Sequence, residues 1–397
     1  MKHLLFFAKR YLFSKSENNA INIIVYIASL GVFFASMAFI IVLSGFSGIR
    51  TFNLNLIELT NPEIKILPIK GKHFAFNDSI ENILNSEKNI QNYSKVLSEK
   101  VFLSYNNKQK IAIIKGVDDN FYKIIPLDST IFIGQKPDYK LNELLVGVGL
   151  ANDLGVMISS GNNPQVVKII VPKPGKGIVS DPRKAFHSKY FFPTGVYQTS
   201  SDHDNTYIYT SINQVQDLLD FNQNEISQIE IKLKNKKLID KTINNLKNKL
   251  GKSFKILNRQ EQNPLIFRML NTENLMTYFI LVLILLLALF NVIGTLIMIV
   301  IDKADNIKTL KILGLKISEI RKIFMIQGVS MTLISGFAGL LIGIILVYIQ
   351  MKKPFLFIPQ ANMPYPVEIH FINISAIVFT LFVLSLFSTT IAVRRIK

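Results

Sequence analysis

Residue patterns that could support catalysis or nucleotide binding are few in this sequence. The five histidines are dispersed, and neither H-E-x-x-H nor G-x-S-x-G occurs. Asp202-His203-Asp204 could bind a metal but is more typical of a polar turn. Gly251-Lys252-Ser253 imitates the end of a phosphate-binding loop, but Leu246 stands where its first glycine is needed. Gly147-Val-Gly149 is followed by Asn152 where a dinucleotide loop needs glycine. We therefore predict no catalytic residue and no metal site.

The most unusual stretch is the charged segment 302–324, DKADNIKTLKILGLKISEIRKIF, which lies between long apolar runs. Its apolar residues recur at helical spacing, at Ile307, Leu310, Leu313, Ile317, Ile320 and Phe324. Gly314 suits a left-handed stop after a first helix, and Ser318 suits the N-cap of the next. We expect the apolar edge to enter a groove in a partner while the lysines steer the approach. A basic loop lying on lipid headgroups is the alternative.

Four windows of the 397-residue chain are nearly free of charge and long enough to cross a bilayer, which takes about 20 helical residues. They run from Ile21 to Leu43, Leu275 to Ile301, Ile323 to Tyr348 and Ile372 to Val393. The first could be a cleaved signal peptide, but it follows a basic leader and has no A-x-A-like site before Leu43. We therefore predict an integral membrane protein with an uncleaved first span.

Charge in the short loops predicts the orientation. Basic residues gather in the leader, in the loop after the second span and at the C-terminal end, and four spans put all three on one side. That side is then cytoplasmic, and the large segment between spans one and two is extracytoplasmic.

The net charge of +18 does not indicate nucleic-acid binding, because the basic residues of the large segment are scattered. The absence of cysteine excludes disulfides and thiolate metal sites. We thus expect packing alone to hold the large domain together.

Two of the spans are expected to continue beyond the bilayer as stalks. The helical pattern after Gly48 persists to Asn61-Pro62, where proline ends it. Pro264 suits a first helical turn, and no breaker follows before Ile301. A helix of that length measures about 57 Å, nearly twice the hydrocarbon thickness.

The large segment alternates short strands with helices. Strands are predicted at 63–67, 94–104, 110–117, 230–234 and 254–257, and helices at 80–86 and 237–250, the second capped by Gly251. The middle part, 137–221, is rich in strand and turn patterns. The fold class predicted is therefore an α+β membrane protein with a 1+3 arrangement of spans and a large extracytoplasmic α/β domain.

Small residues line one face of two spans. In span three they are Gly328, Thr332, Gly336, Gly339 and Gly343, and in span one Ala28, Gly31, Ala35 and Ala38. Such faces let helices approach closely, either within the chain or as a dimer seam. Asn291 in span two is expected to hydrogen-bond to a neighbouring helix rather than to line a lipid path.

An ordered set of motifs resembles the MacB/FtsX-like ABC transporter permeases. The segment 301–328, IDKADNIKTLKILGLKISEIRKIFMIQG, resembles their coupling segment, although Leu315 stands where alanine is usual. Other motifs resemble the lipoprotein-releasing, LolC/LolE-type branch. They are VLSGFSGIRTFNLNLIELTNPEIKIL after span one, KGVD at 115–118, LLVGVGLANDLGVMISSGN at 144–162, TGVYQTSSDHDNTYIYTSINQVQDLL at 194–219 and NPLIFRMLNTENLMTYFILVLILLLALFNVIG at 263–294.

The resemblance implies a permease subunit of the bacterial inner membrane that works with a cytoplasmic ABC ATPase dimer and a second permease, identical or related. ATP and magnesium would bind the ATPase, and no cofactor is expected in this chain. The substrate implied is a lipoprotein, released from the inner membrane and passed to a periplasmic carrier. The implied coupling residues are Asp302, Lys303, Ile307, Leu310, Lys311, Leu313, Gly314 and Arg321.

The resulting division of the chain is as follows: leader 1–20, span and stalk 21–60, periplasmic domain 61–262, stalk and span 263–301, coupling helix 302–322, span 323–350, periplasmic loop 351–371, span 372–393 and tail 394–397. The periplasmic domain divides into a porter-like part, 61–136 and 222–262, and an inserted β-rich part, 137–221.

Two alternatives remain. One is another branch of the same permeases, although an FtsX-like regulator of cell-wall hydrolases would have a smaller outer domain and a MacB-like exporter often carries a fused ATPase. The other is a membrane receptor or scaffold without transport. A neighbouring gene for an ABC ATPase would argue against that second alternative.

Overall fold

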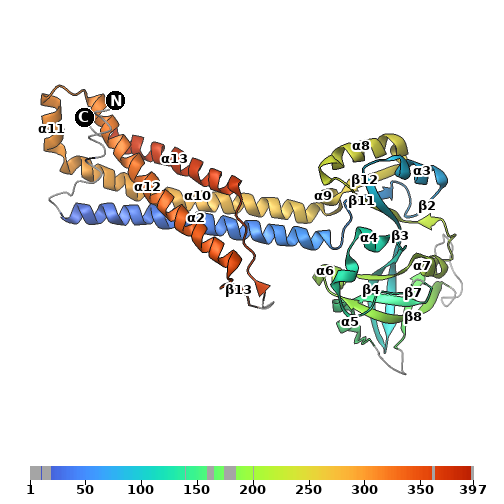
Figure 1. Ribbon diagram of the computed structural model, residues 1–397. Helices are drawn as coiled ribbons and strands as arrows, with labels where there is room; N and C mark the ends of the chain where they lie inside the picture. The colour runs from blue at the N-terminus through green and yellow to red at the C-terminus, as the bar shows by residue number, and fades with distance from the viewer. Residues whose placement is uncertain are drawn as a thin grey trace. The chain divides into compact units, whose positions relative to one another are not determined.

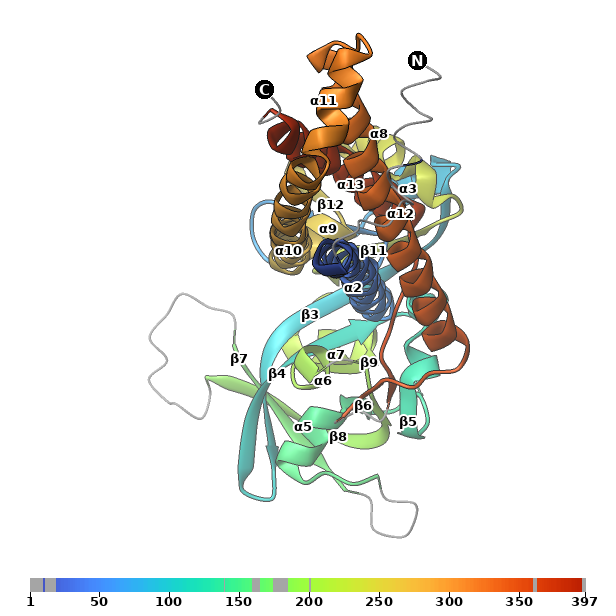
Figure 2. The ribbon, with the colours of Figure 1, turned by 90° about the vertical axis from the view of Figure 1, so that its left-hand side faces the viewer.

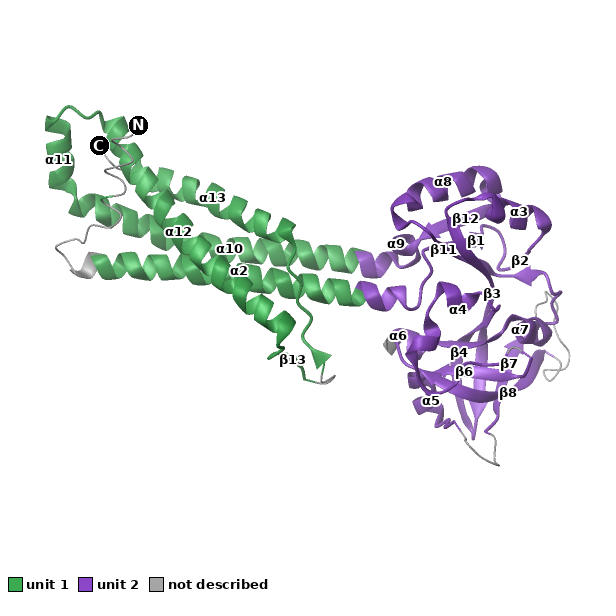
Figure 3. Ribbon diagram, in the orientation of Figure 1, with its two compact units in different colours: residues 1–53, 268–397 green, residues 54–267 purple. Residues whose placement is uncertain are grey.

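The computed structural model describes Arg10 and residues 19–138, 140–158, 165–173, 185–199, 201–359 and 363–394. Contacts divide the chain into two compact units, coloured separately in Figure 3. Unit 1 comprises residues 1–53 and 268–397, and unit 2 comprises residues 54–267. The predicted fold class holds in its main features: four long apolar helices, with a mixed α/β unit between the first and the second.

Unit 1 is built from long helices that lie side by side (Figures 1 and 2). They are α2 (Asn19–Glu58), α10 (Pro264–Asp302), α12 (Ile317–Lys352) and α13 (Phe371–Val393), with the short α11 (Ala304–Ile312) between α10 and α12. By length and composition, the four long helices could cross a membrane. Figure 1 shows α11 at one end of these helices and the small strand β13 (Phe357–Ile358) at the other. β13 pairs with β14 (Met363–Pro364).

Proline and its neighbours set two helix ends as expected. α2 ends at Glu58, and a turn at Leu59 and Thr60 leads to Pro62. α10 begins at Pro264, whose missing N–H costs nothing in a first turn. The last residues of α2 and the first of α10 are counted with unit 2, so each helix continues without a break past the unit boundary.

Unit 2 is organised around one ten-stranded sheet. Its order is β12-β1-β11-β3-β4-β9-β6-β8-β5, with β7 paired to both β3 and β8. The strands are β1 (Ile64–Pro68), β3 (Ile90–Tyr105), β4 (Lys108–Val117), β5 (Ile131–Gly134), β6 (Glu143–Gly147), β7 (Val167–Pro172), β8 (Phe186–Tyr197), β9 (Tyr207–Ser211), β11 (Gln228–Leu233) and β12 (Phe254–Asn258). The short strands β2 (Phe74–Ala75) and β10 (Glu225–Ile226) form a separate pair.

Helices cover the two faces of this sheet unequally. The main core packs α3 (Asp78–Ser86), α5 (Val148–Leu154), α7 (Ile212–Leu219) and α8 (Ile239–Leu250) against the sheet. A smaller cluster lies under α4 (Phe121–Ile124) and the 3₁₀ turn Leu127–Thr130. Val96 belongs to the smaller cluster and Leu97 to the main core, because neighbouring residues of a strand point to opposite faces. The remaining helices are α6 (Ser201–Asp204) and α9 (Arg259–Gln262).

The sheet crosses the predicted boundary between the porter-like and inserted parts. β4, at 108–117, pairs in parallel with β9, at 207–211, through partners such as Lys115 and Tyr209. The division into two parts therefore stays a prediction, while the hydrogen-bonded sheet is continuous across it.

Candidate coupling element and helix seam

The charged segment folds into a short helix and a bend. α11 follows a one-residue break at Lys303, and its C-terminal end is followed by Gly314, whose φ of 88° needs a residue without a Cβ. The predicted stop at Gly314 is confirmed. The predicted N-cap at Ser318 is wrong: α12 begins at Ile317, and the N–H of Lys316 donates to the Glu319 carboxylate at 3.0 Å. Glu319 therefore caps this turn from three residues further along the chain.

Two of the predicted coupling residues face into unit 1. Ile307 and Leu310 are 8% and 6% exposed and belong to the apolar core of the long helices. That core also contains Ile299 of α10 and Ile320 and Phe324 of α12. The prediction that Ile307 and Leu310 form an apolar edge for a partner groove is therefore wrong for this conformation. Both side chains already pack against the core of the long helices.

The outward apolar contacts come from the bend instead. Ile312 is 85% exposed, Leu313 is 71% exposed and Ile317 is 40% exposed. The left-handed Gly314 changes the chain direction between Leu310 and Ile317, so the apolar residues do not form the one continuous stripe predicted from spacing. They divide into an inward pair, Ile307 and Leu310, and an outward group, Ile312, Leu313 and Ile317. Ile312 was missed because it lies off that stripe; the glycine two residues later is the signal that could have found it.

Exposed basic residues are close in sequence to the outward group. Lys311, Lys316, Arg321 and Lys322 are all exposed. Lys303 lies 3.3 Å from Asp302, and Lys308 lies 2.9 Å from Asp305. The bend thus exposes three aliphatic side chains, of which Ile312 and Leu313 are the most exposed, in a stretch of sequence rich in exposed basic residues.

The glycine face of α12 is filled by other helices of the same chain. A Cβ added at Gly339 would collide with the backbone oxygen of Phe33 and with the Ser36 hydroxyl of α2. A Cβ at Gly343 would collide with Ile40. Ser36 Oγ donates to the backbone oxygen of Gly336 at 2.9 Å, which fixes α2 against α12.

Nearer the start of α12, glycines of the same helix pack against α10 and α13. A Cβ at Gly328 would lie 2.5 Å from side-chain carbons of Leu296 and Thr389, and one at Gly336 would lie 3.0 Å from Leu381. Of the two uses predicted for small-residue faces, this structure shows close packing within the chain. We call Gly328, Gly336, Gly339 and Gly343 the helix seam.

Asn291 lies outside the seam. Its side chain is exposed on α10 and forms no hydrogen bond to another helix among the described residues. The structure therefore shows no interhelical hydrogen bond from Asn291 to the residues that it describes. Of the span-one faces, Ala28 and Ala35 are buried, whereas a Cβ at Gly31 would meet open space.

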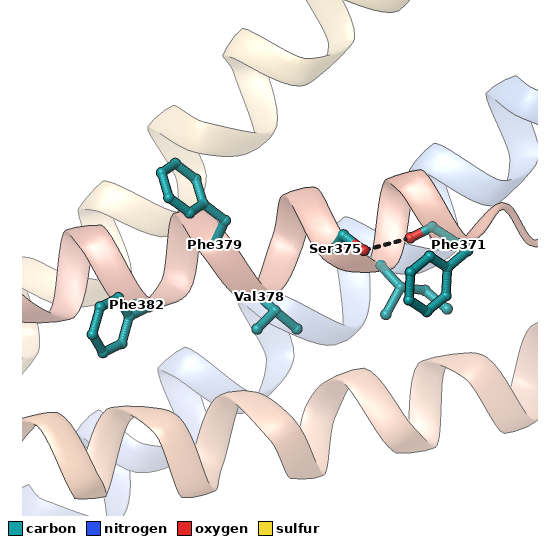
Figure 4. Close-up of a pocket in the computed structure, with 6 residues that line it drawn as sticks. Phe371, Ser375, Val378, Phe379 and Phe382 are labelled. Carbon is teal, nitrogen blue, oxygen red and sulfur yellow. Dashed lines mark hydrogen bonds between the residues drawn. The ribbon is translucent and has the colours of Figure 1, made fainter.

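The outer face of α13 carries a shallow hollow, shown in Figure 4. Its lining consists of Phe371, Ile374, Ser375, Val378, Phe379 and Phe382. The Ser375 hydroxyl donates to the backbone oxygen of Phe371 at 2.9 Å, so the polar atom is satisfied within the helix. This apolar surface offers no polar group to orient a small molecule.

The glycine patterns of unit 2 have structural roles. Gly147 and Gly149 lie where β6 leads into α5, and side chains there would collide with Asp204 and Asn205. Gly251-Lys252-Ser253 follows α8 and precedes β12, the reverse of the strand–loop–helix order of a phosphate-binding loop.

His203 is half-buried and packs against the buried aromatic side chains of Tyr197 and Tyr209. Its Nε2 lies 3.0 Å from the Tyr209 hydroxyl, and Tyr197 packs beside it. Burial first, and then the charges of Lys115 and Lys65, lower the pKa of His203 to about 3. The described residues contain no group of three or more carboxylates and histidines suited to a metal.

A buried ion pair adjoins this cluster. Lys115 Nζ lies 3.5 Å from Glu230 Oε1, with the two side chains 5% and 0% exposed. The Lys115 ammonium also lies 5.0 Å from the ring centroid of Tyr207. On β1, Lys65 faces Glu230 in the strand register, and burial, followed by repulsion from Lys115, lowers the pKa of Lys65 to about 8.

Comparison with known proteins gives consistent matches. Residues 278–397 match the family model described as FtsX-like permease C-terminal. Over 387 residues, 97% of this chain and 94% of the relative, the sequence is 28% identical to the lipoprotein-releasing system transmembrane protein LolC of Buchnera aphidicola subsp. Schizaphis graminum. Over 352 residues, 86% and 80% of the two chains, it is 23% identical to the transmembrane protein LolE of that system in Haemophilus influenzae.

A weaker likeness exists among solved structures. The periplasmic region of MacB from Actinobacillus actinomycetemcomitans aligns with 54% of this chain and 95% of its own, at 18% identity and a TM-score of 0.36. At that TM-score and identity, the likeness supports no conclusion about the function of this chain. The sequence matches confirm the resemblance to MacB/FtsX-like permeases of the lipoprotein-releasing type, and the family match spans most of α10, all of α11 and α12, and α13.

Proposed function

We propose that this chain is the permease subunit of an ABC transporter that releases lipoproteins from the bacterial inner membrane for transfer to the outer membrane. Its relatives over most of the chain are named as transmembrane proteins of a lipoprotein-releasing system. Four helices suit membrane spans in length and composition. The positive charge of the loop after α10 supports a cytoplasmic location for that loop, and unit 2 would then lie in the periplasm.

The observation that carries the proposal is the two-sided character of α11 and its bend. Ile312 and Leu313 project outward, whereas Ile307 and Leu310 pack into the core of the long helices. A force applied to the outward pair is transmitted to the spans by the inward pair without passing through a flexible loop. Such an element suits a subunit whose energy comes from another protein.

A partner ATPase dimer would bind ATP and magnesium and close against this bend. Aliphatic side chains at the centre of a contact provide affinity, and a basic border guides the approach of an acidic groove. The chain would supply no catalytic residue. A second permease, identical or related, would complete the transporter.

The work required matches an ATP-driven task. Withdrawing acyl chains from a bilayer costs about 0.8 kcal/mol for each CH₂ group, so a lipoprotein with two or three chains costs on the order of tens of kcal/mol. Movement of α11 would shift α10 and α12, and α10 is one uninterrupted helix from Pro264 to Asp302. Its internal hydrogen bonds resist bending, which lets it transmit displacement along its length.

The test uses Ile312→Asp/Leu313→Asp, with Asn306→Asp as the matched control. All three side chains are exposed, so neither variant should disturb the core, and the control adds charge to the same helix without removing an apolar contact. We expect purification from membranes to recover an ABC ATPase with wild type and Asn306→Asp, and at least tenfold less with the double variant. Lipoprotein release into a periplasmic carrier should fall in parallel.

Recovery of equal ATPase with all three proteins would contradict docking at the bend. Recovery of no ATPase with wild type would contradict the transporter itself, and a receptor or scaffold without transport would then be favoured.

A further inference from the structure

The segment that joins α12 to α13 carries exposed apolar side chains at the end of unit 1 opposite α11 (Figure 1). Phe355, Leu356, Phe357 and Met363 are 55%, 53%, 49% and 49% exposed. They flank and form the β13–β14 hairpin. We call residues 353–359 and 363–364 the apolar hairpin.

Hydrogen bonds hold the backbone of the apolar hairpin in one conformation, in which these side chains are exposed. Gln350 is only 4% exposed, and both the nitrogen and the oxygen of its side-chain amide form hydrogen bonds to the hairpin backbone and to Tyr365. Its Nε2 donates to the backbone oxygens of Leu356 and Tyr365, and its Oε1 accepts from the N–H groups of Phe355 and Leu356, all at 2.9 to 3.3 Å. A buried glutamine that is saturated in this way holds the hairpin in place.

The segment leading from the hairpin into α13 forms hydrogen bonds to α2. The Glu368 N–H donates to the backbone oxygen of Ser44 at 3.0 Å, and the Asn373 amide donates to the Ser47 hydroxyl at 2.8 Å. The backbone of Pro366 lies so close to Gly48 that a Cβ there would collide with it. Three helices of unit 1 therefore fix where the apolar side chains point.

The exposed apolar surface continues onto the membrane-spanning helices. Phe371 and Ile372, which begin α13, are 81% and 79% exposed, and Tyr348 near the end of α12 is 56% exposed. Lys352 and Lys353 are exposed beside the hairpin. Large apolar side chains next to two lysines, at the end of two spans, match the composition of segments that lie in the headgroup layer.

We propose that the apolar hairpin inserts into the interfacial layer of the lipid leaflet on the side where α12 and α13 are joined. Phe355, Leu356, Phe357 and Met363 would lie among the upper acyl carbons, with Lys352 and Lys353 near anionic phosphates. The occupant is lipid because this surface is continuous with helix faces that meet acyl chains. The proposal rests on the membrane location given under the proposed function and adds a contact made outside the four spans.

Insertion would hold one end of the bundle at a fixed depth. Through Gln350 and Ser44, the hairpin joins α12 to α2, so its depth becomes the depth of both helix ends. When α11 is displaced at the other end, this anchor would let the helices tilt about a point in the leaflet rather than slide through it.

The chain contains no tryptophan, so a single substitution creates a unique fluorophore. The test variant is Phe357→Trp in the full chain, reconstituted into vesicles of phosphatidylcholine and phosphatidylglycerol. One vesicle set carries bromine on acyl carbons near the headgroup. The other set carries bromine on acyl carbons near the terminal methyl group. Two controls are Phe379→Trp, which is 67% exposed on α13, and Leu238→Trp, which is 45% exposed in unit 2.

The three variants should give different quenching patterns. Phe357→Trp should show blue-shifted emission that headgroup-proximal bromine quenches more strongly than distal bromine. Phe379 lies eight residues, or about 12 Å, beyond the start of α13, so the Phe379→Trp emission should respond more to distal bromine. The Leu238→Trp emission should respond to neither. A Phe357→Leu protein of unchanged thermal stability would show that replacing Phe357 does not prevent folding.

Two results would separate the hairpin proposal from the proposed function. If Phe379→Trp is quenched and Phe357→Trp behaves like Leu238→Trp, insertion is wrong while the membrane location stands. If neither brominated lipid quenches Phe379→Trp, both the insertion of the apolar hairpin and the membrane location of unit 1 are wrong. Blue-shifted emission from Phe357→Trp without bromine quenching would indicate a protein occupant and would also overturn lipid insertion.

Discussion

In unit 2, isoleucine, leucine and valine side chains fill the space between the sheet and its helices, and charged side chains mostly lie outside. In unit 1 many large apolar side chains of the long helices, such as Phe290 and Phe379, are exposed, and only 28% to 39% of an 18-residue apolar window in each of these helices is buried. Small and hydroxyl-bearing residues such as Gly339, Ser36 and Thr389 lie inside. In the membrane location proposed for unit 1, lipid would surround this apolar surface, so removal of apolar side chains from water would not be what holds its helices together.

The two units also treat buried polarity differently. Unit 2 buries formal charge, in the Lys115–Glu230 pair. Within the spans of unit 1, the buried polar groups are neutral, and Ser385 and Thr389 satisfy their hydroxyls on backbone oxygens of their own helix. Unit 2 should therefore respond most to loss of charge, and unit 1 most to loss of close approach.

The largest effect is expected from Glu230→Leu. This change leaves the buried Lys115 and the half-buried Lys65 without their shared counter-charge, and we expect a loss of about 3 to 5 kcal/mol of stability in unit 2. Amide hydrogen exchange in the reconstituted full chain should accelerate in β1, β4 and β11, while α12 and α13 stay unchanged.

The double variant Glu230→Leu/Lys115→Met provides the matched control. It removes both members of the pair and should recover part of the loss. Equal acceleration in both units would contradict the comparison, because it would show that the units do not unfold separately.

Gly339→Ala should affect unit 1 instead. The added Cβ collides with backbone and hydroxyl atoms of α2, and displacing them should cost about 1 to 3 kcal/mol. Gly294→Ala is the control, because a Cβ there meets open space. Exchange should increase in α2 and α12 for Gly339→Ala alone, with the exchange of the unit 2 strands unchanged.

How much of this arrangement follows from sequence depends on whether a feature is local. Pro264 as a first helical residue, Gly251 as a cap and the left-handed Gly314 were predicted correctly, because each depends on the backbone freedom of one residue. The parallel pairing of β4 with β9 joins segments about 100 residues apart, and no local pattern indicates it.

The candidate site divides in the same way. Spacing predicted a helix at the coupling segment, but the assignment of Ile307 and Leu310 to an outer surface was wrong because tertiary packing decides which face is covered. Asn291 poses the same problem, because the sequence does not tell which side of α10 is covered, and Asn291 lies on an exposed side.

The smallest effect should come from a charge at the edge of unit 2. A hydrogen bond from His73, followed by one from Lys72, lowers the pKa of Glu99 to about 2 from its usual 4.5. Because the folded-state pKa is the lower one, the stabilisation is complete above pH 4.5 and is lost as pH falls toward 2. Glu99→Gln should therefore cost about 1 to 2 kcal/mol at pH 7 and almost nothing near pH 2.

Thermal unfolding of wild type and Glu99→Gln between pH 2.5 and 7 would measure this convergence, with Glu273→Gln as the control for an exposed carboxylate in unit 1. A constant difference between wild type and Glu99→Gln across that range would mean that the carboxylate charge contributes nothing there. Convergence would show that even the half-buried edge of unit 2 depends on charge, whereas the seam of unit 1, which holds no titrating group, should keep its Gly339→Ala defect at every pH.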